Sequence, residues 1–209
     1  MGNTRGDATR MRLILVAERL FAERGLESVT LAEIGEVAEQ RNTRVVNYHF
    51  GDRRGLLLAI LKLRTTQTAE RRLELCDKVL ATTTAGTPER LRGLVEAYTV
   101  ALAEQRHVGN YLGLVSRLET DYGRWDGYMA EFNPSWKAFV ELLRAELPHL
   151  SQRAFAQRLE AVSILQTHML ATRERRERDG RPAKPAVYAE WLADVIDIEL
   201  GVFLVTPSD

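Results

Sequence analysis

Apolar side chains recur every three or four residues near the start of the chain, which is the pattern of a helix with one buried face. Ile14, Ala17 and Phe21 lie on that face of a helix predicted over residues 11–23, and Gly25 follows it as a C-terminal cap. No segment alternates apolar and polar residues with a period of two, so strands are not expected anywhere in the chain. The pattern predicts an all-α protein.

Two short helices are predicted next, joined by a tight polar turn. Thr30 is suited to cap the first helix, and Glu33 completes a capping box, in which each side chain bonds the backbone N–H of the other residue. The apolar face of this helix consists of Leu31, Ile34 and Ala38. The second helix is predicted over residues 43–50, with Asn42 as its N-cap. Its inward side chains are Val46 and Phe50.

Longer helices are predicted for the rest of the chain. One runs from residue 54 to about residue 80 and ends before the clearest loop, at residues 81–88, where Pro88 suits the first turn of the next helix. The helices expected beyond this loop span residues 89–105, 111–119, 127–147, 151–178 and 186–205. Asn133-Pro134 is expected to kink or restart one of them. Three short helices therefore lead into a bundle of longer ones.

A short helix, a tight turn and a second short helix that ends in an aromatic residue are typical of helix-turn-helix DNA recognition. The first helix braces the second, which then lies in the major groove. The outward side chains predicted for the second helix are Thr43, Arg44, Val45, Asn47 and Tyr48. Arg44 supplies a bidentate donor for guanine, Asn47 an amide suited to adenine, and Val45 an apolar surface for a thymine methyl.

Contacts with DNA phosphates are expected from neighbouring residues. Tyr48, His49 and Arg53 lie toward the helix end, where such contacts fix the register without reading the sequence. Free backbone N–H groups at the helix starts, Thr30 and Thr43, also suit a phosphate. The chain has 29 basic and 29 acidic residues and no formal net charge, so DNA binding depends on these local groups rather than on overall charge.

Residues 8–60, about a quarter of the chain, carry several motifs in a distinctive order and spacing. They are Ile14-Leu15, Ala17, Leu20-Phe21-Ala22, Gly25, Thr30, Ile34, Ala38, Tyr48-His49-Phe50 and Leu56-Leu57. This set resembles the TetR family of transcriptional regulators. The resemblance implies a homodimer that binds a palindromic operator in double-stranded DNA, usually as a repressor, until a small molecule binds.

The resemblance also implies roles for single residues. Thr43, Arg44, Val45 and Asn47 fall where the family reads bases, and Tyr48, His49 and Arg53 fall where it touches the DNA backbone. With the N-caps Thr30 and Asn42, these residues form the predicted DNA-binding set. The family usually has a glycine in its turn, whereas residues 36–50 contain none. Either a non-glycine residue there adopts a positive φ, at a cost on the order of 1 kcal/mol, or the turn takes a different path.

Two domains are expected: a TetR-type helix-turn-helix DNA-binding domain over residues 8–53, with the motif at about 30–50, and a ligand-binding and dimerisation domain over residues 54–209. A pocket in the second domain should be concave and mostly apolar, which suits a small hydrophobic effector. The candidate lining residues are Tyr98, Tyr111, Trp125, Tyr128, Phe132, Trp136, His168 and Met169. For each of them the alternative is burial in an ordinary core. The helix over residues 54–80 joins both domains and is the expected lever.

The last two predicted helices are the expected dimer surface. They carry more apolar faces than one small bundle needs, which indicates a partner, and the family resemblance implies the same surface. The residues assigned to it are Phe155, Leu159, Val162, Trp191, Val195, Ile198 and Val202. A two-fold interface of four helices would present two recognition helices to the two half-sites of an operator.

Other classes of protein are disfavoured by what the sequence lacks. No Ser-His-Asp set, glycine-rich phosphate loop or paired-carboxylate spacing indicates an enzyme. His107 and His168 are not spaced with other ligands as a metal site requires, and no cofactor is expected. A single cysteine, Cys76, short apolar runs and no secretory signal predict a cytoplasmic protein without a membrane partner. The remaining alternative is a helical partner-binding protein whose helix-turn-helix is vestigial.

Overall fold

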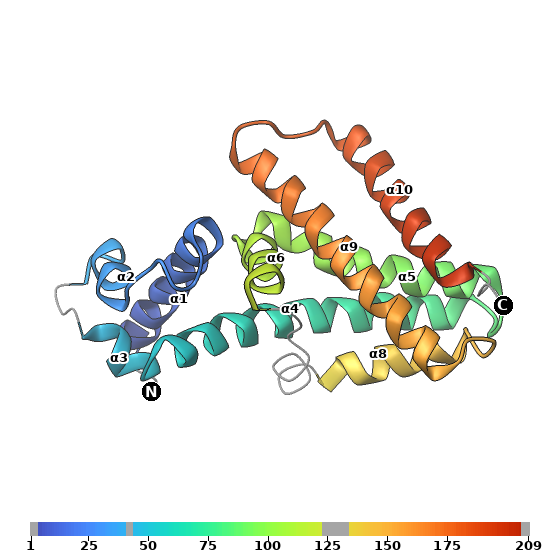
Figure 1. Cartoon of the computed structure of the whole chain (residues 1–209), viewed down its shortest axis with the longest axis horizontal. Coiled ribbons are helices and arrows are strands. Elements are labelled where there is room, and N and C mark those ends of the chain that lie inside the picture. Colours follow the sequence, from blue (N-terminus) through green and yellow to red (C-terminus); the bar gives the residue numbers. More distant parts are fainter. Residues whose placement is uncertain (1–3, 41–43, 123–133, 206–209) are drawn as a thin grey trace.

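The chain is all-α in a computed structural model that describes residues 4–40, 44–122 and 134–205 (Figure 1). Its first helices are α1 (Thr4–Arg24), α2 (Leu31–Val37), α3 (Val45–Phe50) and α4 (Arg53–Thr82). They are followed by α5 (Pro88–Ala103), the 3₁₀ helix η1 (Glu104–His107), α6 (Tyr111–Tyr122), α8 (Pro134–Ala145), α9 (Gln152–Arg178) and α10 (Pro185–Leu204). No strand occurs in these three ranges, and the predicted fold class is confirmed.

Local chemistry explains where several helices begin and end. Thr30, Thr87 and Ser151 each accept a hydrogen bond from the amide three residues further on, at the starts of α2, α5 and α9. Pro88 occupies the first turn of α5, as predicted. The chain leaves α1 through Gly25, whose φ of 89° is readily adopted only by glycine.

Some helix limits differ from the prediction. α1 begins at Thr4 rather than at residue 11, so its first turns precede the apolar pattern that located the helix. The helix predicted over residues 127–147 is described from Pro134, where a restart was expected. Residues 123–133 lie outside the described part of the chain.

Two larger apolar clusters form the core of the described residues, and α4 contributes to both. The first combines α1, α2, α3 and the beginning of α4 with one face of α6. The second combines the later part of α4 with α5, α8, α9 and α10. α4 is therefore a continuous element between the helix-turn-helix and the rest of the molecule, as the lever hypothesis requires. The exact domain limits stay a prediction.

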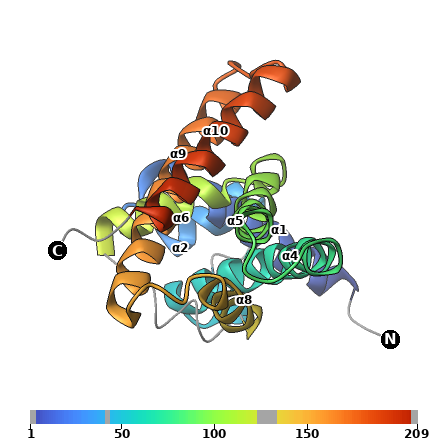
Figure 2. The same ribbon diagram turned by 90° about the vertical axis from the view of Figure 1, so that its right-hand side faces the viewer.

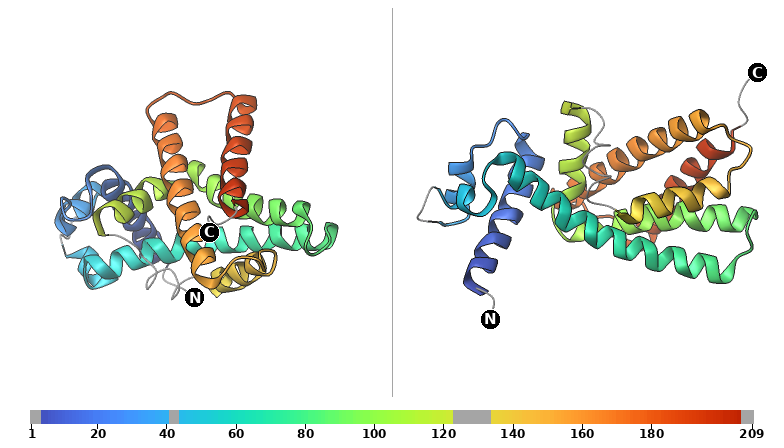
Figure 3. Two further views of the ribbon diagram at one scale, coloured as in Figure 1. Left: turned by 45° about the vertical axis from the view of Figure 1, so that its right-hand side comes forward. Right: turned by 90° about the horizontal axis from the view of Figure 1, so that it is seen from below.

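The last two helices stand out from the layer formed by α4 and α5 (Figure 2). α9 packs against α6, and α10 packs against both α9 and α5. Seen from below, α4 runs from the α2–α3 region to the opposite end of the molecule (Figure 3). Among the described helices, none combines the length and the apolar character needed to cross a membrane.

Candidate DNA-binding surface and sensor core

The helix-turn-helix is braced by a small apolar core. Ile34 of α2 and Val46 of α3 are fully buried and belong to the same cluster as the start of α4, as predicted. The hydroxyl of Thr30 accepts the backbone N–H of Glu33 at 3.1 Å. The carboxylate of Glu33 contacts Arg24, so only the Thr30 half of the predicted capping box forms among the described residues.

The turn after α2 uses a non-glycine residue in the left-handed region. Glu39 has a φ of 57°, and its carboxylate is paired with Arg12 of α1. The next residue, Gln40, donates its backbone N–H to the carbonyl of Gly35 at 2.9 Å. The first of the two alternatives for the glycine-free turn is therefore correct: Glu39 adopts the conformation that glycine would adopt more easily.

The two sides of α3 differ in their exposure to solvent. Successive residues of a helix are rotated by about 100° about its axis, and this rotation decides on which side each residue lies. Positions 45, 46, 49 and 50 share one side, and Val45, only 9% exposed, packs in the same core as Val46. The outward position predicted for Val45 is wrong, since the helical period places it on the buried side. On the other side Arg44, Asn47 and Tyr48 are exposed, Tyr48 by 83%. We call these three residues the reading face.

Two predicted DNA contacts already have partners within the chain. Asn47 donates its side-chain N–H to the carbonyl of Gly51 at 3.0 Å, at the C-terminal end of α3. Arg53 donates to the carbonyl of Leu26 and to the carboxylate of Glu27, both at 2.9 Å. Arg53 therefore ties the start of α4 to the loop before α2.

The remaining predicted DNA-binding residues lie near the ends of α3. His49 is partly buried, with its ring 5.1 Å from that of Tyr48. α3 begins at Val45, with Arg44 as an N-cap that makes no side-chain capping bond. Asn42, which was expected to cap the helix, and Thr43 lie outside the described residues.

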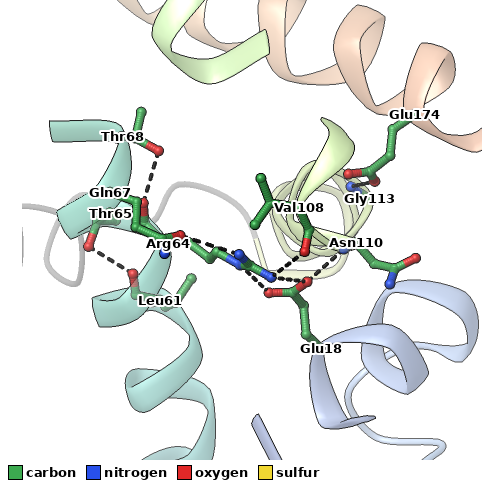
Figure 4. Close-up of polar contacts among 10 residues, drawn as sticks. All are labelled: Glu18, Leu61, Arg64, Thr65, Gln67, Thr68, Val108, Asn110, Gly113 and Glu174. Carbon is green, nitrogen blue, oxygen red and sulfur yellow. Dashed lines mark hydrogen bonds and ion pairs between the residues drawn. The ribbon is translucent and has the colours of Figure 1, made fainter. Parts of the chain in front are cut away.

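A buried ion pair joins α1 to α4 (Figure 4). Nε of Arg64 donates to Oε2 of Glu18 at 2.7 Å, and Nη2 donates to Oε1 at 3.1 Å. The two side chains are 2% and 0% exposed. Nη2 also donates to the carbonyl of Val108 at 3.2 Å, and the backbone N–H of Asn110 donates to Glu18 at 2.6 Å. The pair thus binds the helix-turn-helix side of the molecule to the segment before α6.

The same contacts leave no room around the segment between η1 and α6. A Cβ on Gly109 would lie 2.1 Å from the Glu18 carboxylate and 2.3 Å from the Arg64 guanidinium. Further along, the backbone N–H of Gly113 donates to Glu174 of α9 at 2.8 Å, and burial raises the pKa of Glu174 to about 7 (Figure 4). A continuous set of polar contacts therefore runs from α1 through α6 to α9.

The sequence interpretation missed this pair, although a signal exists. Glu18 follows Ile14 by four residues and precedes Phe21 by three, so it lies on the apolar face of α1. Arg64 follows Ile60 by four residues on α4. A charged residue on a buried helical face usually needs a buried partner.

The predicted sensor residues separate into different places. Tyr98 and Trp136 belong to one aromatic cluster with Phe139, in which ring centroids lie 5.2–5.7 Å apart. Tyr111 is buried in the other core, against α1 and α4, so it does not line the same region as Tyr98. His168 and Met169 are partly buried on α9. Trp125, Tyr128 and Phe132 lie outside the described residues.

Three of the seven dimer residues predicted on α9 and α10 are core residues of one protomer. Phe155, Val162 and Val195 are at most 5% exposed, and their predicted surface position is wrong because they fill the core of the chain itself. The partly buried ones are Leu159, Trp191 and Val202. Ile198 is 49% exposed, as a dimer contact requires. The prediction omitted the exposed apolar residues Val187, Leu204 and Val205.

Comparison with known proteins agrees with this architecture. Residues 13–60 match the family model of bacterial regulatory proteins of the tetR family, and residues 92–197 match that of the tetracyclin repressor-like C-terminal domain. No curated protein sequence matches the chain.

Similar folds occur among solved structures. A TetR-like transcriptional regulator from Rhodococcus sp. RHA1 has a TM-score of 0.57 and 14% identity, with 93% of each chain covered. PfmR, a TetR family transcriptional regulator from Thermus thermophilus, has a TM-score of 0.55 and 18% identity, with 91% of this chain and 97% of PfmR covered. AmtR from Mycobacterium smegmatis has a TM-score of 0.53 and 18% identity, with 95% of this chain and 87% of AmtR covered.

The two family models together extend over the helix-turn-helix and most of the helical domain that follows it, and the second alone covers half of the chain. The braced α2–α3 pair lies within the first match, α4 runs from it toward the second, and the second extends from α5 into α10. The chain belongs to the TetR family and is a DNA-binding transcriptional regulator.

Proposed function

We propose that the protein is a homodimeric repressor that binds a palindromic operator and is released from it by a small-molecule effector. The observation that carries the proposal is the reading face. Arg44, Asn47 and Tyr48 project from the second helix of the motif, while the opposite side of that helix is buried. An exposed aromatic side chain flanked by a cation and an amide suits a DNA groove better than water.

We assign base contacts to Arg44 and Asn47, and contacts with the DNA backbone to Tyr48 and His49. Arg53 has a different assignment, because its guanidinium is bonded to Leu26 and Glu27. Its role in the proposal is to orient the start of α4 beneath the motif. Val45 is excluded from the DNA contacts because it is buried.

The proposed dimer partner is a second copy of the chain, bound along α9 and α10. Val187, Ile198 and Val205 are 51%, 49% and 61% exposed, and their spacings along α10 and its C-cap are close to whole helical turns. They therefore form one apolar stripe. Ile164 of α9, the helix that packs against α10, is 44% exposed. Burial of such surface stabilises a complex by about 25 cal/mol per Å² of apolar area.

Effector release follows from linkage between two sites. An effector that binds better to a form with displaced reading faces shifts the population away from the DNA-binding form. α4 and the Glu18–Arg64 pair are the proposed connection, since α4 contributes to both cores and the pair ties it to α1. A flexible glycine insertion near Thr65–Gln67 should preserve effector binding but uncouple it from DNA release.

The test begins with selection of an operator from a random double-stranded library, followed by fluorescence-anisotropy titration over a salt series. Arg44→Ala should weaken operator binding by about tenfold or more, because a bidentate base contact contributes about 1–3 kcal/mol. Arg153→Ala is the matched control, since Arg153 is an exposed arginine on α9, and it should bind like the wild type. Sedimentation should give a dimer, and Ile198→Asp should give monomers.

The vestigial alternative makes the opposite prediction. If the selection enriches no sequence, or if a charge reversal, Arg44→Glu, leaves DNA binding unchanged in a folded protein, the reading face does not read DNA. Weakening that is equal for operator and scrambled DNA would reassign Arg44 from base reading to the phosphate backbone.

A further inference from the structure

The core of the helical domain contains a second buried arginine, and this one lacks an acidic partner among the described residues. Arg72 of α4 is 4% exposed. Within residues 4–40, 44–122 and 134–205, its Nε and Nη1 atoms have no hydrogen-bond partner and no carboxylate forms an ion pair with it. Burial lowers the pKa of Arg72, but a guanidinium keeps its proton in proteins, so the charge remains.

Aromatic rings surround the Arg72 guanidinium instead of acids. Its central carbon lies 5.2 Å from the ring centroid of Tyr98 in α5. The ring centroids of Trp136 and Phe139 in α8 lie at 5.4 and 5.5 Å. The hydroxyl of Tyr98 is hydrogen-bonded to that of Ser163 at 3.0 Å, so it is engaged with α9 rather than with the cation.

None of the acids in the interior of this domain forms an ion pair with Arg72 among the described residues. Glu199 is bonded by Thr99 and by Gln166. Glu174 accepts the backbone N–H of Gly113. Glu119 lies 3.6 Å from His168. Contacts with aromatic faces offset part of the cost of burying a cation, but they leave the Nε and Nη1 donors of Arg72 unbonded.

An unpaired buried cation beside a wall of rings is complementary to one class of molecule. An organic acid could place its anionic group on the free N–H donors and its apolar or aromatic body against the rings. A neutral ligand could at most accept hydrogen bonds from the donors and would leave the buried charge uncompensated, and a cation would be repelled. The chemistry therefore distinguishes among effectors by charge.

We propose that the effector is an organic acid with an apolar or aromatic body, and that Arg72 binds its anionic group beside Tyr98, Trp136 and Phe139. The proposal rests on the proposed function, because it names the chemistry of the effector. We expect the ligand to enter beside Trp136, the only partly buried ring of the three. Arg72 is then the residue that determines the specificity of the sensor.

The test uses two fluorescent probes that differ in one group. Anilinonaphthalene sulfonate is an aromatic anion, and phenylnaphthylamine is its neutral counterpart. The wild-type dimer should bind the sulfonate about tenfold or more tightly than the neutral probe, because one ionic hydrogen-bonded contact is worth at least a factor of about ten in affinity. Arg72→Met should remove this preference and change the affinity for the neutral probe by no more than about twofold. Arg72→Lys, which keeps the positive charge, should retain part of the preference for the sulfonate.

Arg173→Met is the matched control. Arg173 is another arginine beside aromatic rings, 5.6 Å from the centroid of Tyr188 and 5.3 Å from that of Trp191, and its loss should leave the preference for the anion unchanged. Equal binding of both probes by the wild type, or a preference for the anion that survives Arg72→Met, would overturn the proposal. Loss of the preference in Arg173→Met alone would move the anion site to that residue.

Operator binding without any probe separates this proposal from the function on which it rests. Arg72→Met should bind the selected operator like the wild type, because Arg72 packs on the rings of the second core and not on the reading face. If operator binding is normal but the probes bind alike, only the acid effector is excluded. If no operator is found but Arg72 still selects the anion, the repressor proposal fails and the anion site stands. Circular dichroism and urea unfolding confirm that each variant folds.

Discussion

Arg64 and Arg72 are both buried on α4, about two turns apart, and the structure accommodates their charges in opposite ways. Arg64 has a carboxylate at 2.7 Å and further acceptors around it. Arg72 has aromatic faces around its guanidinium and no acid among the described residues. A paired charge fixes the geometry of a junction, whereas an unpaired one is a stability cost that a ligand can relieve. The comparison separates a structural charge from a sensing one on the same helix.

The buried acids also differ in whether an opposite charge compensates them. Glu18 is neutralised by Arg64 and belongs to the junction between the two cores. Glu199 of α10 is bonded by two neutral groups, Thr99 and Gln166, and burial raises its pKa to about 7. The junction therefore contains balanced charge, and the sensor core contains unbalanced groups of both signs. Substitutions that remove one group at a time should tell these two cases apart.

The largest effect is expected from Glu18→Gln. The substitution leaves Arg64 buried without its counter-charge, and breaking a buried ion pair in this way typically costs about 3–5 kcal/mol. Urea unfolding should show a correspondingly lower free energy of unfolding. The control is Asp197→Asn, which breaks the exposed pair with Arg92 and should have a small effect. Equal losses in both variants would mean that the junction is not held by its charge pair.

The second expected effect depends on pH and involves Glu199. Its usual pKa is near 4.5, and burial raises the pKa to about 7 in the folded chain. Between these values the folded protein keeps a proton that the unfolded chain has released, so this residue lowers the free energy of unfolding as pH rises from about 4.5 to about 7. Above pH 7 the loss in free energy of unfolding caused by this carboxylate is complete and is on the order of 3 kcal/mol.

Glu199→Gln should therefore match the wild type near pH 5 and become more stable than it near pH 8. Urea unfolding at both pH values measures the difference. Glu96→Gln is the control, because Glu96 is exposed on α5, and its difference from the wild type should not change with pH. A Glu199→Gln difference that is equal at both pH values would show that Glu199 is already ionised in the fold at pH 5.

The third expected effect is a gain of stability in Arg72→Met. Replacing a buried charge by an apolar side chain of similar length removes a desolvation cost, and such replacements typically stabilise a protein by about 1–4 kcal/mol. Because the cation–aromatic contacts are lost at the same time, we expect a gain of about 2 kcal/mol here. Arg64→Met should do the reverse, because it leaves Glu18 buried without a partner. If Arg72→Met destabilises the protein as Arg64→Met does, the comparison between the two arginines fails.

The sequence pattern was sufficient for the helices but not for the side-chain partners. Apolar periodicity located α2, α4, α5 and α9 to within a few residues, because each has one continuous buried face. The motif around Tyr48 was identified from the same apolar periodicity and from the order of the family motifs along the chain. Val45 was misplaced because α3 is short and two adjacent apolar residues leave its rotation ambiguous.

Long-range partners could not be read from the pattern. Glu18 and Arg64 are 46 positions apart, and nothing in either helix specifies the other. Phe155 and Val195 were assigned to a dimer surface because an apolar helix face does not reveal whether its partner is the same chain or another. Only the packing of α10 on α9 and α5 decides that question.

The smallest expected effect lies in the turn of the helix-turn-helix, at Glu39. A non-glycine residue with a φ of 57° costs on the order of 1 kcal/mol, part of which the pair with Arg12 offsets. Glu39→Ala removes the pair and keeps the strain, whereas Glu39→Gly removes both. The glycine variant should therefore be the more stable of the two by about 0.5–1 kcal/mol in urea unfolding, less the greater chain entropy that glycine has when unfolded. A glycine variant no more stable than the alanine variant would mean that the strain at Glu39 does not exceed the entropy that glycine adds to the unfolded chain.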